Sequence, residues 1–440
     1  MTSLSRASAS AMLTLAVTAG AALSAVPAMA ATPAWVATWQ ASPQPTWGSD
    51  FLFPTNVQPE LHDQTVRQVA RISLGGQRLR IVLSNAYGRE PVVVGKTTLA
   101  RPAESGAIAA NSLRSVTFGG KEIATILPGA SLVSDPVALP VPALARVAVS
   151  IHLPNATPVS TFHWDGRQTG WIAAGEQTSN VAWAKTDEAR QSTTARLLLT
   201  GIQVETVQAT RAVVVIGDSI TDGATASLDT DSRWPDFLAA RLAPHGVAVV
   251  NAGISGARLL SDGMGANALA RLERDALTQP GVESVIVMLG INDIAWLGTA
   301  FAPNAARPTL DALAAGYRQL VEQAHAHGLR VIGTTLTPFA GALPGTPLDN
   351  YYHPDKDALR QQVNDWIRHS GVFDAVIDFD AALRDPYHPT RIAERYDSGD
   401  RLHPSDEGNR AMADAVDLDA VLPGLRAASD GTPSKTSQER

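Results

Sequence analysis

The feature that most constrains the fold is an alternation of apolar runs and helical patterns in the second half of the chain. Five short, almost wholly apolar runs cover residues 211–216, 247–250, 284–289, 329–335 and 375–377. Runs of this kind are typical of strands that are buried on both faces of a sheet. Helical patterns cover residues 234–242, 266–276, 309–327, 355–369 and 405–416. Strand alternating with helix predicts one parallel sheet with helices on both faces, over residues 209–425.

The first half of the chain has a different periodicity. Residues 65–74 alternate polar and apolar side chains, and residues 79–83, 92–94 and 145–152 are also typical of short strands. Gly75-Gly76 then predicts a two-residue hairpin between the first two of these strands. Gly, Pro and Asn interrupt the pattern about every ten residues, which favours an antiparallel sandwich. We predict an all-β sandwich domain over residues 31–208.

The two ends of the chain are not expected to belong to these domains. Met1 to Arg6 carry one positive charge, a small apolar stretch follows, and Ala28-Met29-Ala30 has the small-x-small pattern of a cleavage site. We predict a signal peptide over residues 1–30, cleaved after Ala30, and a secreted or periplasmic protein; the alternative is a membrane anchor. Residues 426–440 are polar, with Gly, Pro and Ser, and predict a disordered tail.

Composition excludes several classes of function. The formal charge is −7, from 35 Lys and Arg against 42 Asp and Glu, and no basic stripe is present, so nucleic-acid binding is not expected. The absence of cysteine excludes disulfides, thiolate zinc sites, iron–sulfur clusters and cysteine nucleophiles. His325 and His327 would diverge on a helix and therefore do not predict a metal site. We expect no metal, no cofactor and no stable membrane insertion, and the oligomeric state is left open.

Polar and glycine residues follow the predicted strands at the points where ligands bind in open parallel sheets. Gly217-Asp218-Ser219 follows the first apolar run, Gly256 lies after the second, and Asn292-Asp293 after the third. Asp400 and His403 stand just ahead of the last helical pattern. Each motif alone has a structural explanation, as a helix N-cap, a turn or a surface histidine. Their order along the chain favours a functional site.

These residue types suit acyl transfer. A serine hydroxyl needs a base and a group that orients the base, so we assign Ser219 as nucleophile, His403 as base and Asp400 as its partner. The oxyanion of the intermediate needs hydrogen-bond donors. The backbone N–H groups of Ser219 and Gly256 and the side-chain amide of Asn292 can supply them.

The motifs resemble the four sequence blocks of the SGNH hydrolases, also called GDSL-type esterases. The resemblance covers about residues 211–420, and it implies a flavodoxin-like three-layer α/β/α domain with the residue roles given above. Trp35-Val-Ala-Thr-Trp39, Arg67-Gln68 and the segment from Arg78 through Ser84-Asn85 resemble a secreted two-domain branch with a leading β-sandwich. That branch is loosely associated with carbohydrate deacetylation.

The sequence therefore predicts a secreted serine esterase that removes short acyl groups, with acetyl expected, from a carbohydrate or similar alcohol. Its partner would be a small-molecule or polysaccharide ester. The catalytic loops are short and mixed in polarity, so we expect an open site that favours acetyl and butyryl esters. One alternative is a lipase, phospholipase or thioesterase, with an acyl channel formed by Ile254, Leu259, Leu260, Trp296, Leu297 and Phe301. Another is a non-catalytic glycan-binding protein, in which some of the N-terminal tryptophans stack on sugars.

Overall fold

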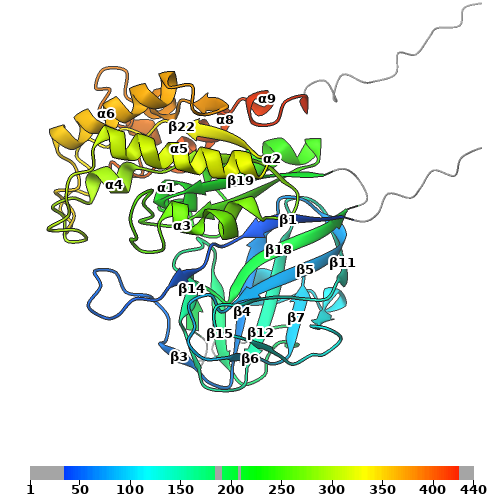
Figure 1. The fold of residues 1–440 in the computed structure, drawn as a ribbon. Helices are drawn as coiled ribbons and strands as arrows, with labels where there is room; N and C mark the ends of the chain where they lie inside the picture. Colours follow the sequence, from blue (N-terminus) through cyan, green and yellow to red (C-terminus); the bar gives the residue numbers. More distant parts are fainter. Residues whose placement is uncertain (1–33, 184–190, 207–209, 426–440) are drawn as a thin grey trace, which may run out of the picture. The chain divides into compact units, whose positions relative to one another are not determined.

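The computed structural model describes residues 34–183, 191–206 and 210–425, which belong to one compact unit beginning at Pro33 (Figure 1). The predicted signal peptide, its cleavage after Ala30 and the predicted tail over residues 426–440 lie outside the described residues. Within the described ranges, no helix combines the length and apolarity needed to cross a bilayer.

The second half of the chain forms a five-stranded parallel sheet, as predicted. Its strand order is β20-β19-β21-β22-β23, which is the flavodoxin-like order 2-1-3-4-5. The strands are β19 (Arg211–Gly217), β20 (Val247–Gly253), β21 (Val282–Met288), β22 (Arg330–Thr334) and β23 (Ala375–Ile377). The strand order reverses at β19, so the ends of β19, β20 and β21 flank the point where such sheets bind ligands.

Helices cover both faces of this sheet (Figure 1). Val214 and Ile216 of β19 pack in one core with α3, α5 and α6, whereas Val213 and Val215 pack in another with α2 and α8. Alternate side chains of a strand point to opposite faces, so the two cores confirm the three-layer arrangement. The longer helices are α2 (Trp234–Leu242), α5 (Leu310–Ala326), α6 (Pro354–His369) and α8 (Asp406–Asp414); the shorter are α1 (Ser219–Asp222), α3 (Ala268–Leu272), α4 (Ile291–Ala295), α7 (Phe379–Leu383) and α9 (Leu418–Val421). The predicted helix over 266–276 continues from α3 as a π-helical turn, Glu273–Leu277.

The first half of the chain forms two antiparallel sheets around a shared core, which confirms the strand-rich sandwich. One sheet contains β1 (Ala34–Gln40), β18 (Leu199–Thr206), β5 (Gly76–Ser84), β10 (Ser131–Val133) and β11 (Val137–Val141). The other contains β16 (Gln191–Thr193), β15 (Gly170–Ala174), β4 (Gln64–Arg71), β12 (Arg146–Leu153), β7 (Thr97–Ala100) and β8 (Arg114–Val116). A short three-stranded sheet contains β2 (Gln44–Pro45), β14 (Thr161–His163) and β17 (Arg196–Leu197). Two strand pairs, β3 (Glu60–Leu61) with β13 (Thr157–Pro158) and β6 (Val92–Val94) with β9 (Ala124–Ile126), lie in the same half.

The predicted hairpin at Gly75-Gly76 is wrong. β4 pairs with β12 and β15 in one sheet, whereas β5 pairs with β18, β10 and β11 in the other. After β4 the chain leaves its sheet, because the N–H of Ser73 donates to the carbonyl of Thr38 in β1. A Cβ at Gly75 would lie 2.3 Å from the carbonyl oxygen of Val141, so a glycine is required where the chain changes sheets.

Direct contacts join the sandwich to the parallel sheet. The N–H of Ala37 donates to the carbonyl of Pro280 at 2.9 Å, and the N–H of Val249 in β20 donates to Ser73 Oγ at 3.1 Å. Gln44 Nε2 donates to the carbonyl of Met264 at 2.9 Å. The division of the chain between residues 208 and 209 stays a prediction.

Candidate active site

The structure brings Ser219, His403 and Asp400 together. Ser219 is the first residue of α1, directly after β19, and the other two precede α8. His403 Nε2 lies 2.8 Å from Ser219 Oγ, and His403 Nδ1 lies 2.6 Å from Asp400 Oδ2. Since the carboxylate accepts the proton on Nδ1, Nε2 is the nitrogen that can accept the proton of Ser219.

The short loop from Asp400 to His403 fixes the carboxylate locally. Asp400 Oδ1 accepts the backbone N–H groups of Leu402 and His403, at 2.9 and 2.8 Å. Burial alone would raise the pKa of Asp400, but the hydrogen bond and charge of His403, together with these two N–H groups, lower it to about 2. Asp400 is therefore ionised wherever His403 has to be oriented.

Gly256 lines the same pocket as Ser219 and has a backbone conformation that favours glycine. Its φ is 72°, and a Cβ there would lie 2.7 Å from Met264 Sδ and 2.9 Å from the Trp296 ring. Any side chain at this position would displace the loop that carries its N–H group.

Asn292, in α4, also lines this pocket, and its amide orientation is fixed on both sides. Asn292 Nδ2 donates to the carbonyl of Ala257 at 3.0 Å, and Asn292 Oδ1 accepts from the hydroxyl of Tyr351 at 2.7 Å. Burial, together with nearby carboxylates, raises the pKa of Tyr351 well above its usual value, so the hydroxyl keeps its proton. The second hydrogen on Nδ2 is thus available to an oxyanion. Sequence reasoning selected Asn292 but not Tyr351.

The pocket around Ser219 has a volume of about 260 Å³ and walls that are largely apolar. Leu52, Phe53 and Trp164 come from the first half of the chain. The Phe53 and Trp164 rings stack at 5.4 Å, and the Trp296 and Phe301 rings stack at 4.5 Å. The remaining apolar lining is Met264, Leu343, Pro347, Leu348, Tyr351 and Leu402.

The apolar character of this wall differs from the mixed polarity expected from the catalytic loops. Of the six apolar residues considered for an acyl channel, Trp296 and Phe301 line the pocket, whereas Ile254 and Leu259 are fully buried in the core of the sheet. Leu260 packs against the same core, and Leu297 is not among the lining residues. The sequence does not predict this wall from the catalytic loops alone. The feature that could have indicated it is the apolar cluster Phe51-Leu-Phe53, which lies within a stretch that contains Gly and Pro.

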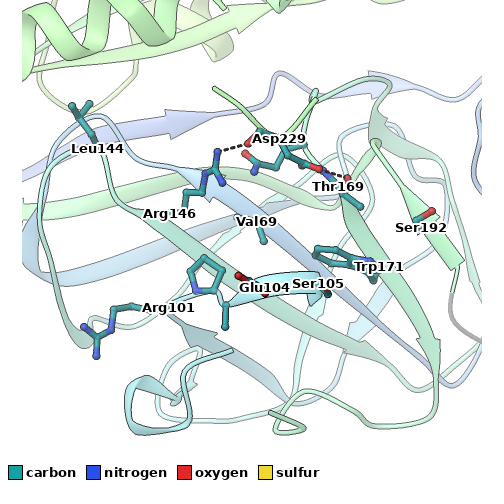
Figure 2. Close-up of a pocket in the computed structure, with 13 residues that line it drawn as sticks. Val69, Arg101, Glu104, Ser105, Leu144, Arg146, Thr169, Trp171, Ser192 and Asp229 are labelled. Atoms are coloured by element: carbon teal, nitrogen blue, oxygen red, sulfur yellow. Dashed lines mark hydrogen bonds between the residues drawn. The ribbon is translucent and has the colours of Figure 1, made fainter. Parts of the chain in front are cut away.

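A second, larger cavity of about 1280 Å³ lies beside the six-stranded sheet and is lined mostly by polar side chains (Figure 2). Arg146 and Thr169 meet Asp229 there, and Trp171 forms part of the wall. None of Ser219, Asp400 and His403 lines it. Trp39 and Trp183 are buried, at 6% and 7% exposure, which agrees with a core role for these two.

Asp218 combines a structural role with an unusual ionisation. Its Oδ1 caps α1 by accepting the N–H of Ile220 at 3.0 Å, so the N-cap interpretation of Gly217-Asp218-Ser219 is also correct. Its Oδ2 is buried and has no hydrogen-bond partner among the residues that the structure describes. Burial raises the pKa of Asp218 to about 7.

We expect Asp218→Asn to stabilise the protein at pH 8 and not at pH 4. The pKa of Asp218 is about 3.9 in an unfolded chain, so between about pH 4 and 7 the native state binds more protons, and the free energy of unfolding falls as the pH rises. Asparagine keeps the acceptor for Ile220 and removes the buried charge. The thermal midpoint of the variant relative to wild type should rise by about 3 °C or more from pH 4 to pH 8. An equal difference at the two pH values would contradict this assignment.

The parallel three-layer fold, with a serine, histidine and aspartate in hydrogen-bond contact at its edge, defines a serine hydrolase class of site. Residues 213–416 match the family described as GDSL-like Lipase/Acylhydrolase, so the chain contains a GDSL-like (SGNH) hydrolase domain and is an ester-bond hydrolase. No curated protein matches the chain.

Several solved structures resemble this domain. A catalytic mutant of Axe2, an acetylxylan esterase from Geobacillus stearothermophilus, is 26% identical, covers 47% of this chain and 91% of its own, and has a TM-score of 0.35. A GDSL-like lipase from Bacteroides thetaiotaomicron is 19% identical, covers 50% and 89%, and has a TM-score of 0.36. The acetyl xylan esterase AlAXEase is 21% identical, covers 46% and 96%, and has a TM-score of 0.34. At TM-scores this low, the likenesses carry no argument about the substrate of this chain.

Proposed function

We propose that the protein is a serine carboxylesterase with Ser219 as nucleophile, His403 as general base and Asp400 as the group that orients His403. The observation that carries the proposal is the continuous hydrogen-bonded chain from Ser219 Oγ through His403 to Asp400, at 2.8 and 2.6 Å, in the wall of an apolar pocket.

The residues present account for each step of ester hydrolysis. His403 Nε2 takes the proton of Ser219 as Oγ attacks the ester carbonyl, and the Ser219 and Gly256 N–H groups and the Asn292 amide stabilise the oxyanion. The protonated His403 then gives its proton to the departing alcohol, which leaves an acyl group on Ser219. A water molecule, deprotonated by His403, attacks this acyl group; the bond to Ser219 Oγ then breaks, His403 returns the proton to Oγ, and the acid is released.

The pocket supports an acyl group longer than acetyl. At about 30 Å³ for each water-sized group, a volume of about 260 Å³ holds roughly eight such groups. Burying each methylene of an acyl chain against these apolar walls favours binding by about 0.8 kcal/mol. We propose that activity is highest on butyryl to octanoyl esters, between the acetyl preference expected from sequence and the long chains of a lipase.

For the alcohol, we retain the proposal of a carbohydrate or similar polar alcohol. Thr225 and Thr346 line the pocket; their hydroxyl protons are donated to backbone carbonyls, and each Oγ1 keeps an acceptor site for the hydroxyl groups of a polar alcohol. The signal peptide over residues 1–30, export from the cytoplasm and the triad roles are part of the same proposal, as is the domain division at residue 208.

A chain-length series of p-nitrophenyl esters tests the acyl preference, and Phe53→Ala locates it. Removing the Phe53 ring takes away the stack on Trp164, so kcat/KM for the hexanoate ester should fall roughly tenfold, while the value for acetate changes less than about threefold. Tyr387→Ala, which removes an aromatic ring that is 87% exposed, is the matched control and should change neither value.

The series has two outcomes that contradict the proposal. Highest activity on acetate, with an equal loss on both esters in Phe53→Ala, would return the enzyme to the acetyl preference. Highest activity on decanoate or longer esters would assign it to the lipase class.

A further inference from the structure

A buried histidine of the first half of the chain contacts the last residue of α1, the helix that begins with Ser219. His163, the last residue of β14, has its Nε2 2.9 Å from Asp222 Oδ1 and its Nδ1 3.0 Å from the carbonyl oxygen of Ser42. The His163 and Asp222 side chains are only 5% and 3% exposed. Asp222 is the last residue of α1, the helix that begins with Ser219.

The contacts define the protonation state of this pair. Asp222 Oδ2 accepts both the backbone N–H and the hydroxyl of Ser255, at 2.9 and 2.8 Å, which fits an ionised carboxylate. Both ring nitrogens of His163 face oxygens that accept hydrogen bonds, so both donate and the ring is an imidazolium.

The charges around the pair agree with an imidazolium. Burial alone would lower the pKa of His163, but the charge and hydrogen bond of Asp222 outweigh it, and the net shift is upward. Arg196, in β17, opposes the positive charge of His163, and Arg233, after α1, is a further cation near Asp222.

Ser255 connects the His163–Asp222 pair to the proposed oxyanion donor Gly256. Ser255 immediately precedes Gly256, which has a φ of 72° and lines the pocket beside Ser219. Asp222 therefore holds the end of the Ser219 helix and, through Ser255, the loop of Gly256. We propose that His163 and Asp222 are positioning residues of the oxyanion hole, which fix the Gly256 N–H relative to Ser219. This proposal rests on the proposed serine esterase function.

An oxyanion donor such as the Gly256 N–H stabilises the transition state only if it is held in position before the reaction. Loss of one oxyanion donor costs about 10²- to 10³-fold in kcat, and a displacement of about 1 Å can cost about 10²-fold. Without the imidazolium, Asp222 is left as a buried, unpaired carboxylate, which must take up a proton or move toward water. Either change weakens its hold on Ser255 and displaces the Gly256 N–H, whereas neither His163 nor Asp222 itself lines the pocket that binds the acyl chain.

The test is His163→Gln in the full chain, with kcat measured per active site titrated by the p-nitrophenol burst. We expect kcat on p-nitrophenyl butyrate to fall between about 10- and 100-fold, with KM changed less than about threefold. The control is His152→Gln: His152 lies in β12 and also contacts a carboxylate, that of Asp63 at 3.0 Å, and neither residue lines the pocket. Its kcat should stay within about twofold of wild type.

Two further variants keep the proposal falsifiable if His163→Gln folds poorly. Ser255→Ala removes only the hydroxyl contact to Asp222 and should lower kcat in the same direction by a smaller factor. Asp222→Asn combined with His163→Gln should lower kcat by no more than the worse single variant, because both act on the same loop.

A lower thermal midpoint with unchanged kcat per active site, in His163→Gln or in Ser255→Ala, would show a purely structural contact and overturn the positioning role. That result is distinct from failure of the proposed function, which would appear as retained activity in Ser219→Ala.

Discussion

Ser219→Ala is expected to lower kcat by at least about 10⁴-fold and leave the fold intact. No other nucleophile among the described residues stands beside His403, so without the hydroxyl no acyl-enzyme forms. The fold should tolerate the change, because the only side-chain hydrogen bond of Ser219 in the described structure joins Oγ to His403. Turnover of p-nitrophenyl butyrate and the thermal midpoint measure the two effects.

The matched control is Ser227→Ala, an exposed serine in the loop after α1 that does not line the pocket. Its kcat should equal that of wild type. If Ser219→Ala keeps more than a few per cent of the turnover, the assignment of the nucleophile is wrong.

Asp400→Asn is expected to be about as damaging, lowering kcat by about 10⁴-fold. The backbone N–H groups of Leu402 and His403 both donate to Oδ1, so an asparagine must place its oxygen there. Its NH₂ group then faces His403 Nδ1, which has to act as the acceptor. The proton of the ring moves to Nε2, and Nε2 can no longer take the proton of Ser219.

Two variants of Asp400 distinguish its effect on the tautomer of the His403 ring from the effect of its negative charge. Asp400→Ala leaves the ring free to choose its tautomer, so we expect it to retain at least as much activity as Asp400→Asn. Raising the pH should not restore Asp400→Asn, because the defect is the position of the proton and not the charge of the ring. A substantially more active asparagine variant would show that Asp400 acts mainly through its charge.

The parallel sheet and the placement of the candidate catalytic residues could be predicted from the sequence because most of their determinants are local. A strand buried on both faces is an uninterrupted apolar run, and the residue after such a run, as with Ser219 after β19, lies at the edge where ligands bind. Asp400 and His403 are three residues apart, so their contact needs no knowledge of the rest of the fold. The contact between Ser219 and His403 needed the order of the motifs as well.

The features that were missed depend on which distant segments pack together. Alternation in β4 and β5 identifies two strands with one apolar face each, and that pattern is the same whether they pair in one sheet or face each other across the core. Phe53 and Trp164, from the sandwich half of the chain, line the pocket. His163, from the same half, contacts Asp222 in the parallel-sheet half. A local pattern does not contain this information.

The residues that line the pocket are far apart in the sequence, so ester hydrolysis requires both halves of the chain to be folded. The lining begins at Leu52 and ends at His403, and the hydrogen bond between Ser219 and His403 joins residues 184 positions apart. Contacts of such long sequence separation form slowly, since the loops they close lose much entropy. During refolding from denaturant, helical circular dichroism should therefore recover before ester hydrolysis. A nascent chain still lacking residue 403 has no assembled catalytic set, so it cannot yet hydrolyse an ester by this mechanism.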